Sequence, residues 1–240
     1  ALSELRTACG MPEAPATVRR DRADAWFRAG VRPVGWVAPE AWDSLAGDYA
    51  ASDGWVRLHT NASPHRQAAL RVLGIEGERD AVARAVSMWR AEQLEEEVVA
   101  EGGCAAVMRT PEQWSRHPQG SAVAGEALVA RETTDPDGAA SAWQPTRARP
   151  LAGLRVLDLT RVLAGPVATR MLAGLGAHVL RIDPPSWSEP ALAVEMTLGK
   201  RTARLDAHDP AGLAQLRRLL ADADVIVHGY RADALERLGL

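Results

Sequence analysis

Lysine is almost missing from this sequence of 240 residues, because Lys200 is its one lysine and arginine carries the remaining positive charge. The two cysteines, Cys9 and Cys104, lack metal-ligand spacing and fit a reducing compartment. No apolar run reaches the length of a bilayer, and the first residues lack a signal-peptide pattern. We therefore expect no membrane segment and a cytoplasmic location.

The sequence also lacks a large excess of either charge, since its formal net charge is -3 at pH 7. Such a balance excludes a polycation that seeks nucleic acid, and the hydrophobic fraction of 47% excludes a disordered chain. The six histidines show neither HExxH nor paired spacing, so we expect no metal. Eight tryptophans against one phenylalanine are interpreted mainly as packing residues.

The order of helical and strand patterns predicts an α+β part followed by an α/β part. A linker is expected at 135–149, where Pro, Gly, Ser and Ala occur without periodicity. We predict four regions: a helical segment at 1–46, a small α+β domain at 47–134, this linker, and a parallel α/β region at 150–240. Within the small domain we predict strands at 54–59 and 104–108, helices at 64–73, 79–89 and 91–101, and a helix capped by Thr110.

Residues 150–183 carry the clearest pattern, a buried strand, a short loop, a helix and a second strand. The helix should begin near Gly165 and Pro166, because a first-turn proline lacks only an amide that would be unpaired anyway. Parallel βαβ units bind ligands at the carboxyl ends of their strands. Chemistry is therefore expected in the loop 160–166 and after Asp183.

The remainder is predicted to hold an irregular segment at 184–199, a short strand at 200–206, a helix at 210–221, a buried strand at 224–229 and a helix from 231. A four-stranded α/β sheet of this kind has no closing element at residue 240, so we expect the natural polypeptide or fold to continue.

Candidate ligand contacts were weighed against ordinary structural roles. The first βα turn lacks GxGxxG, which disfavours a dinucleotide site. The cations Lys200, Arg201, Arg204, Arg231 and Arg237 each fit an ordinary surface role when taken singly. Together, beside the free amides of a helix N-terminus, they indicate a phosphate-bearing ligand. We expect Leu163, Lys200 and Arg237 to line one cleft, and His228 to be a packed histidine.

Four stretches in the same region resemble class III CoA-transferases, the family of formyl-CoA transferase, carnitine CoA-transferase and α-methylacyl-CoA racemase. Residues 150–160 resemble the family's PL.G.RVLDLT, and 162–166 resemble its VLAGP loop. Residues 199–206 resemble NKRSI.LDL, and 225–240 resemble V.VENFRPG.LERLGL. Parts of 47–134 resemble the family's small domain more weakly, although in the family that domain follows the Rossmann-like half.

The resemblance implies a partial Rossmann-like parallel sheet that binds coenzyme A or acyl-CoA as substrate. It implies CoA contacts at six positions: Val162, Leu163, Ala164, Lys200, Tyr230 and Arg237. Two departures are His228-Gly229 in place of the family's Glu-Asn, and a rebuilt loop at 184–189. The family's catalytic aspartate, which forms an acyl-enzyme anhydride, would lie beyond the equivalent of Leu240. No catalytic residue is therefore assigned.

The first hypothesis is that this chain is part of a class III CoA-transferase-like protein. The chain would bind CoA but could not catalyse transfer alone. The alternatives are an acyl-CoA racemase or isomerase of the same superfamily, a non-catalytic CoA-binding or structural partner, and the disfavoured NAD-dependent oxidoreductase. Expected partners are a CoA thioester and either a second copy, in an interlocked dimer, or a complementing chain. Neither nucleic acid nor membrane is expected.

Overall fold

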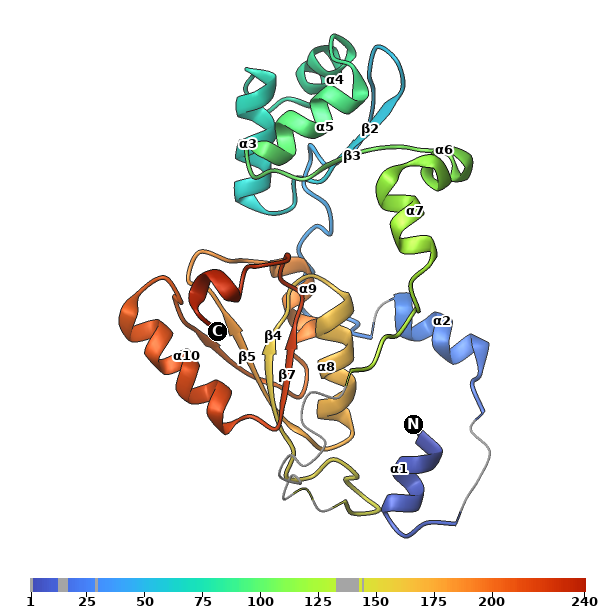
Figure 1. The fold of residues 1–240 in the computed structure, drawn as a ribbon, viewed down its shortest axis with the longest axis vertical. Coiled ribbons are helices and arrows are strands. Elements are labelled where there is room, and N and C mark those ends of the chain that lie inside the picture. Colours follow the sequence, from blue (N-terminus) through green and yellow to red (C-terminus); the bar gives the residue numbers. More distant parts are fainter. Residues whose placement is uncertain (1, 13–16, 29, 133–142, 144) are drawn as a thin grey trace. The chain divides into compact units, whose positions relative to one another are not determined.

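The computed structural model describes residues 2–12, 17–28, 30–132, 143 and 145–240. Most of the predicted linker at 135–149 lies outside these residues. The chain forms two compact units, residues 40–138 and residues 1–39 together with 139–240. Each unit is described by itself (Figure 1).

The unit of residues 40–138 contains an antiparallel sheet of order β1-β2-β3. Val56 of the central strand is paired with Tyr49 on one side and with Val107 on the other. Three helices pack against this sheet, and two more follow it. The elements are β1 (Gly47–Ala50), β2 (Trp55–Leu58), α3 (Ser63–Leu73), α4 (Arg79–Ser87), α5 (Ala91–Ala100), β3 (Ala105–Val107), α6 (Pro111–Arg116) and α7 (Pro118–Ala124).

The helix boundaries in this unit follow from local sequence. Helix α3 stops at Gly74, whose φ of 65° is the left-handed conformation that glycine adopts without cost. Helix α6 begins with a capping box, in which the Thr110 side chain and the Gln113 backbone and side chain satisfy each other. The core consists of apolar side chains from all three strands and from α3, α4 and α5, with Val56, Val86, Leu94 and Val98 fully buried.

The second unit contains a four-stranded parallel sheet of order β6-β5-β4-β7. Strands β4, β5 and β6 follow one another across the sheet in chain order, and β7 pairs with the other side of β4. The elements are β4 (Arg155–Leu159), α8 (Ala164–Gly174), β5 (His178–Asp183), α9 (Pro190–Met196), β6 (Arg201–Arg204), α10 (Pro210–Asp222), β7 (Val225–His228) and a 3-10 turn η1 (Glu236–Leu238).

Helices α8 and α10 cover opposite faces of this sheet. Val156 of β4 packs with Leu172 of α8, whereas its neighbour Leu157 packs with Leu216 of α10. Alternate residues of a strand point to opposite faces, so burial on both sides requires the nearly continuous apolar run seen in β4. The predicted fold class, a parallel α/β sheet preceded by a smaller α+β part, is confirmed.

The N-terminal helices α1 (Leu2–Ala8) and α2 (Arg20–Arg28) belong to the same unit. Arg170 of α8 lies over the Trp26 ring, 4.3 Å from its centroid, and also pairs with Glu195 at 2.7 Å. The Gly30 amide donates to the same glutamate. These contacts fasten α2 to the outer side of α8.

Three details of the α/β unit differ from the sequence-based expectation. The segment 184–199 contains α9, because Pro190 at its first turn is followed by good helix formers. Strand β7 is an edge strand with only every second side chain turned inward, so His228 is exposed instead of packed. In place of the helix expected from residue 231 there is a single 3-10 turn. Asp233, which precedes it, has a φ of 62°, which is incompatible with a right-handed helix.

Candidate functional site

The strand order places the candidate site at the carboxyl ends of β4 and β7. The connections from these two neighbours lead to opposite faces of the sheet, because α8 packs on one face while Tyr230 and Leu240 pack with Leu216 of α10 on the other. The loop 160–163 leaves β4, and residues 229–231 leave β7. Ligands of open parallel sheets bind at this kind of edge.

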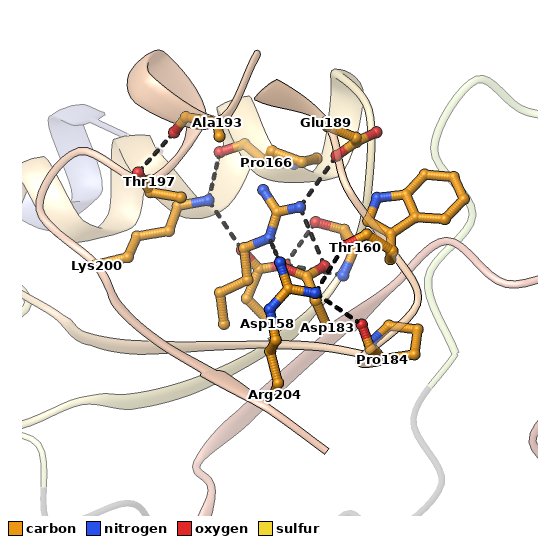
Figure 2. A network of polar contacts seen from close by, with 12 residues as sticks. Asp158, Thr160, Pro166, Asp183, Pro184, Glu189, Ala193, Thr197, Lys200 and Arg204 are labelled. Carbon is orange, nitrogen blue, oxygen red and sulfur yellow. Dashed lines mark hydrogen bonds and ion pairs between the residues drawn. The ribbon is translucent and has the colours of Figure 1, made fainter. Parts of the chain in front are cut away.

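A buried ion pair holds the end of β4 to the start of α8. Lys200 Nζ lies 2.8 Å from Asp158 Oδ2, and neither side chain has any exposed surface. The same ammonium donates to the Pro166 carbonyl at 2.9 Å and to Thr169 Oγ1 at 2.7 Å. All three of its protons therefore have acceptors inside the protein. Figure 2 shows Lys200 with Asp158 and Pro166.

Asp158 is equally well satisfied. Its Oδ1 accepts from the Thr160 amide and hydroxyl, and its Oδ2 accepts from Thr169 at 2.6 Å. Burial alone raises the pKa of this carboxyl, but hydrogen bonds from Lys200, Thr160 and Thr169 outweigh it and hold the pKa below the ordinary value. Asp158 is thus a charged structural anchor.

The first turn of α8 packs tightly on Thr160. A Cβ at Gly165 would come within 2.3 Å of Thr160 Cγ2, so only glycine fits. No described residue accepts a hydrogen bond from the backbone amides of Leu163, Ala164 or Gly165. These amides and the positive end of the helix dipole are suited to an anion.

The loop before α8 has a strained backbone. Val162 has a φ of 67°, which is unfavourable for a β-branched residue. Its amide donates to Glu189 Oε1 at 2.9 Å, and the other oxygen of Glu189 accepts from Arg181 at 3.1 Å. Arg181 is also paired with Asp183 at 2.8 Å. The conformation of the loop is therefore fixed by residues from β5 and the start of α9.

Arg161, in the same loop, lies between two aromatic rings. Its guanidinium carbon is 4.9 Å from the Trp187 ring centroid and 5.4 Å from that of Tyr230. Tyr230 in turn stacks on His228, with ring centroids 6.0 Å apart. Burial raises the pKa of the Tyr230 hydroxyl, which therefore stays neutral. This stack links the loops that follow β4, β5 and β7.

Arg204 fastens the loop that carries Trp187. Its Nη1 donates to the carbonyls of Pro184, Pro185 and Trp187 at 3.3, 2.8 and 2.7 Å. Figure 2 shows Arg204 reaching from its strand towards Pro184. A cation that the sequence suggested as a ligand contact is thus used to hold a loop.

The structure brings together only some of the six residues predicted to bind CoA. Val162, Leu163 and Ala164 share one loop, and Tyr230 meets that loop through Arg161. Lys200 adjoins the loop from inside, where it has no surface left for a ligand. Arg237 is exposed and paired with Asp233 at 2.6 Å. The expectation that Leu163, Lys200 and Arg237 line one cleft is therefore wrong, because Lys200 neutralises a buried carboxylate.

Sequence reasoning missed three residues of this edge. Asp158 is an acid inside an aliphatic strand, a signal that a buried partner must exist. Arg161 and Trp187 are 26 positions apart in the sequence, and no local pattern indicates that they stack.

The described residues contain neither a metal-binding cluster nor a membrane-spanning helix. No group of three or more His, Cys, Asp or Glu among those residues is arranged to hold a metal ion. Likewise, none of the helices in the described ranges is both long and apolar enough to cross a membrane.

Fold and site together define a parallel α/β region with an anion-suited loop at its switch point. Comparison with known proteins gives the family: residues 151–240 match the model of CoA-transferase family III. The match confirms the resemblance of this region to class III CoA-transferases and covers these residues alone.

Several relatives are CoA transferases by name. An acyl-CoA transferase of Gibberella moniliformis is 34% identical over 206 residues, covering 79% of this chain and 36% of the relative. A succinate–glutarate CoA-transferase of Agrobacterium fabrum is 36% identical over 115 residues, covering 40% of this chain and 29% of the relative. The crystal structure of Rv3272 from Mycobacterium tuberculosis has 35% identity and a TM-score of 0.34, covering 39% of this chain and 27% of that one.

The extent of these likenesses differs between the two parts of the chain. The chain spans about a third of the length of the first of these relatives, 36%. Coverage of 79% of this chain is more than residues 151–240 supply, so the Gibberella likeness also includes residues before 151. One relative thus has counterparts of both parts in a single chain.

Proposed function

We propose that residues 150–240 form the CoA-binding part of a class III CoA-transferase-like protein, which moves CoA between carboxylic acids. The observation that carries this proposal is the family match over the same residues that build the loop 160–164. The unpaired amides at the start of α8 support it, because they offer hydrogen bonds to a phosphate. The relatives named as CoA transferases favour transfer over racemisation.

The proposed site consists of Val162, Leu163 and Ala164 at the helix start, with Tyr230 and Arg237 from the end of the sheet. Lys200 takes part as a positioning residue, because its ion pair with Asp158 fixes the strand end against α8. In the family chemistry an enzyme aspartate attacks the thioester carbonyl, forms an anhydride and releases the CoA thiolate. We propose that this aspartate is not supplied by residues 150–240, and we expect residues 1–240 to bind CoA without transferring it.

Calorimetry with CoA, acetyl-CoA and NAD tests the proposal. Both CoA species should bind and NAD should not. Binding of NAD that equals or exceeds that of CoA would contradict the proposal, and measurable transfer by residues 1–240 would contradict the assignment of the acid elsewhere.

Replacement of Leu163 by Glu places a carboxylate at the proposed phosphate position. Leu163 is half exposed, and an acid at a helix N-terminus does not destabilise the helix. We therefore expect CoA to bind about tenfold more weakly, a loss of about 1.4 kcal/mol, with the melting temperature unchanged. The matched control is Leu198→Glu, an exposed leucine of the same unit outside the site, which should leave the affinity unaltered. Equal affinities for both variants would exclude this edge as the phosphate site.

A further inference from the structure

Arg161 is a cation of the candidate site whose side chain has no hydrogen-bond acceptor among the described residues. Four cations near it pair with carboxylates or donate to backbone carbonyls. These are Lys200 with Asp158, Arg181 with Asp183 and Glu189, Arg170 with Glu195, and Arg204 with three carbonyls. No described residue accepts a hydrogen bond from Arg161, and its Nε is buried without a partner.

The stacking of Arg161 determines which ligand chemistry remains open to it. One face of the guanidinium is covered by Trp187 and another contact is made by Tyr230, at 4.9 and 5.4 Å from the ring centroids. A guanidinium that already contacts two aromatic rings still offers its in-plane N–H groups to a ligand. Those groups match the oxygens of a phosphate in a two-pronged geometry.

A second unsatisfied donor lies in the same stack. Trp187 Nε1 is buried without a hydrogen-bond partner, as is Arg161 Nε. The great majority of buried donors in proteins have a hydrogen-bond partner. Two neighbouring donors without one therefore indicate that a ligand supplies the acceptor. The nearest backbone amides, at the start of α8, also lack acceptors. The loops at the carboxyl ends of β4 and β5 therefore supply hydrogen-bond donors and a positive charge. No described carboxylate forms an ion pair with Arg161.

We propose that Arg161, held between Trp187 and Tyr230, binds a phosphate group of CoA and contributes to selection of that ligand. This inference rests on the proposed function and adds a residue and a contact to it. The phosphate is either the diphosphate or the 3′-phosphate of the ribose, which share the chemistry that the guanidinium recognises. The aromatic stack orients the side chain before the ligand arrives, so little side-chain entropy is lost on binding.

The test compares wild-type protein with Arg161→Met and Arg161→Lys, each titrated with CoA and with 3′-dephospho-CoA in a calorimeter. Arg161→Met keeps an unbranched apolar side chain between the rings and removes the charge. It should weaken CoA binding at least tenfold. Arg161→Lys keeps the charge but loses the two-pronged geometry. Its affinity for CoA should therefore lie between those of wild type and Arg161→Met. Arg218→Met, on the exposed side of α10, removes an equal charge and should leave affinity unchanged.

The two ligands separate the two phosphates. An effect of Arg161→Met that vanishes with 3′-dephospho-CoA assigns the 3′-phosphate, and an equal effect with both ligands assigns the diphosphate. Circular dichroism melting checks that both Arg161 variants fold, and the lysine variant carries the test if the methionine variant does not. If both Arg161 variants bind CoA as tightly as Arg218→Met does, the role of Arg161 is overturned while the proposed function stands. Failure of the wild-type protein to bind CoA would overturn the proposed function as well.

Discussion

At the scale of single residues, the central feature is a charge pair that faces inwards. The side chains of Lys200 and Asp158 are both fully buried. Lys200 also donates to the Pro166 carbonyl and to Thr169, and Asp158 also accepts from Thr160 and Thr169. Transfer of two charges from water is costly, so such a pair is not itself a large source of stability. Loss of one partner is far more damaging, because the other stays buried without compensation.

Replacement of Lys200 by Met should lower the free energy of unfolding by about 3–5 kcal/mol, since Asp158 is left as an unpaired buried charge. The double variant Asp158→Leu/Lys200→Met should recover most of that loss. Urea unfolding at pH 7 measures both, with Arg201→Met as a control for the loss of surface charge. A Lys200→Met protein as stable as this control would show that the ammonium is dispensable for folding.

The same pair should give a pH dependence on the acid side. The pKa of Asp158 is lowered on folding from an ordinary value of 3.8, so the unfolded chain takes up the proton more readily than the folded one. Its stabilising contribution is therefore complete above the ordinary pKa and is lost as the pH falls towards the lowered value. The stability difference between wild type and the double variant should be constant from pH 7 to about 5 and should shift against wild type below about 4. A difference that does not change with pH would contradict the charged state of Asp158.

At the scale of elements, helix α8 is positioned by close packing at its start. Gly165 contacts the Thr160 side chain so closely that no Cβ fits, while Gly174 at the other end has open space around it. The free amides at the start of α8 are held in place by this contact, because it sets the distance from the first turn of α8 to the end of β4.

Gly165→Ala and Gly174→Ala form a matched pair in this helix. The first should destabilise the protein by about 1–3 kcal/mol through overpacking and should also weaken CoA binding. The second should be neutral or stabilising by up to about 1 kcal/mol, because alanine is the better helix former. Denaturant unfolding and calorimetry measure the two effects. Equal stabilities would mean that the start of α8 can shift to accept a methyl group.

At the scale of the whole molecule, the chain consists of two units with separate cores. The core of residues 40–138 is drawn from residues of that unit alone, and the core clusters around the parallel sheet come from residues 1–39 and 139–240. Separate cores predict units that can fold independently.

Residues 40–132 expressed alone should therefore fold. We expect a cooperative urea transition with helical circular dichroism, since the buried apolar side chains of this unit contact one another. Replacement of the fully buried Leu94 by Ala should lower the stability of the fragment by about 2–5 kcal/mol, and Val99→Ala on the exposed side of the same helix should have little effect. A fragment without a cooperative transition would show that the unit depends on the rest of the chain.

Local patterns predicted most of the secondary structure. Aliphatic runs gave β4 and β5, glycine ended α3 and α8, and Thr110 capped α6. Helix α9 was not predicted, since the two prolines at 184 and 185 and Trp187 masked a short helix that begins at Pro190. The short strand β1 has its Tyr49 buried by packing that only the assembled sheet provides.

The sequence by itself determined the strand and helix order, the glycine-proline start of α8 and the family of residues 151–240, because each depends on neighbouring residues or on a continuous motif. Only the tertiary structure decided that Lys200 faces Asp158 and not solvent, and that Arg161 lies between Trp187 and Tyr230. These contacts join strands and loops that are far apart in the chain. They follow from which strands are neighbours in the sheet, and side-chain spacing along the chain does not encode that order.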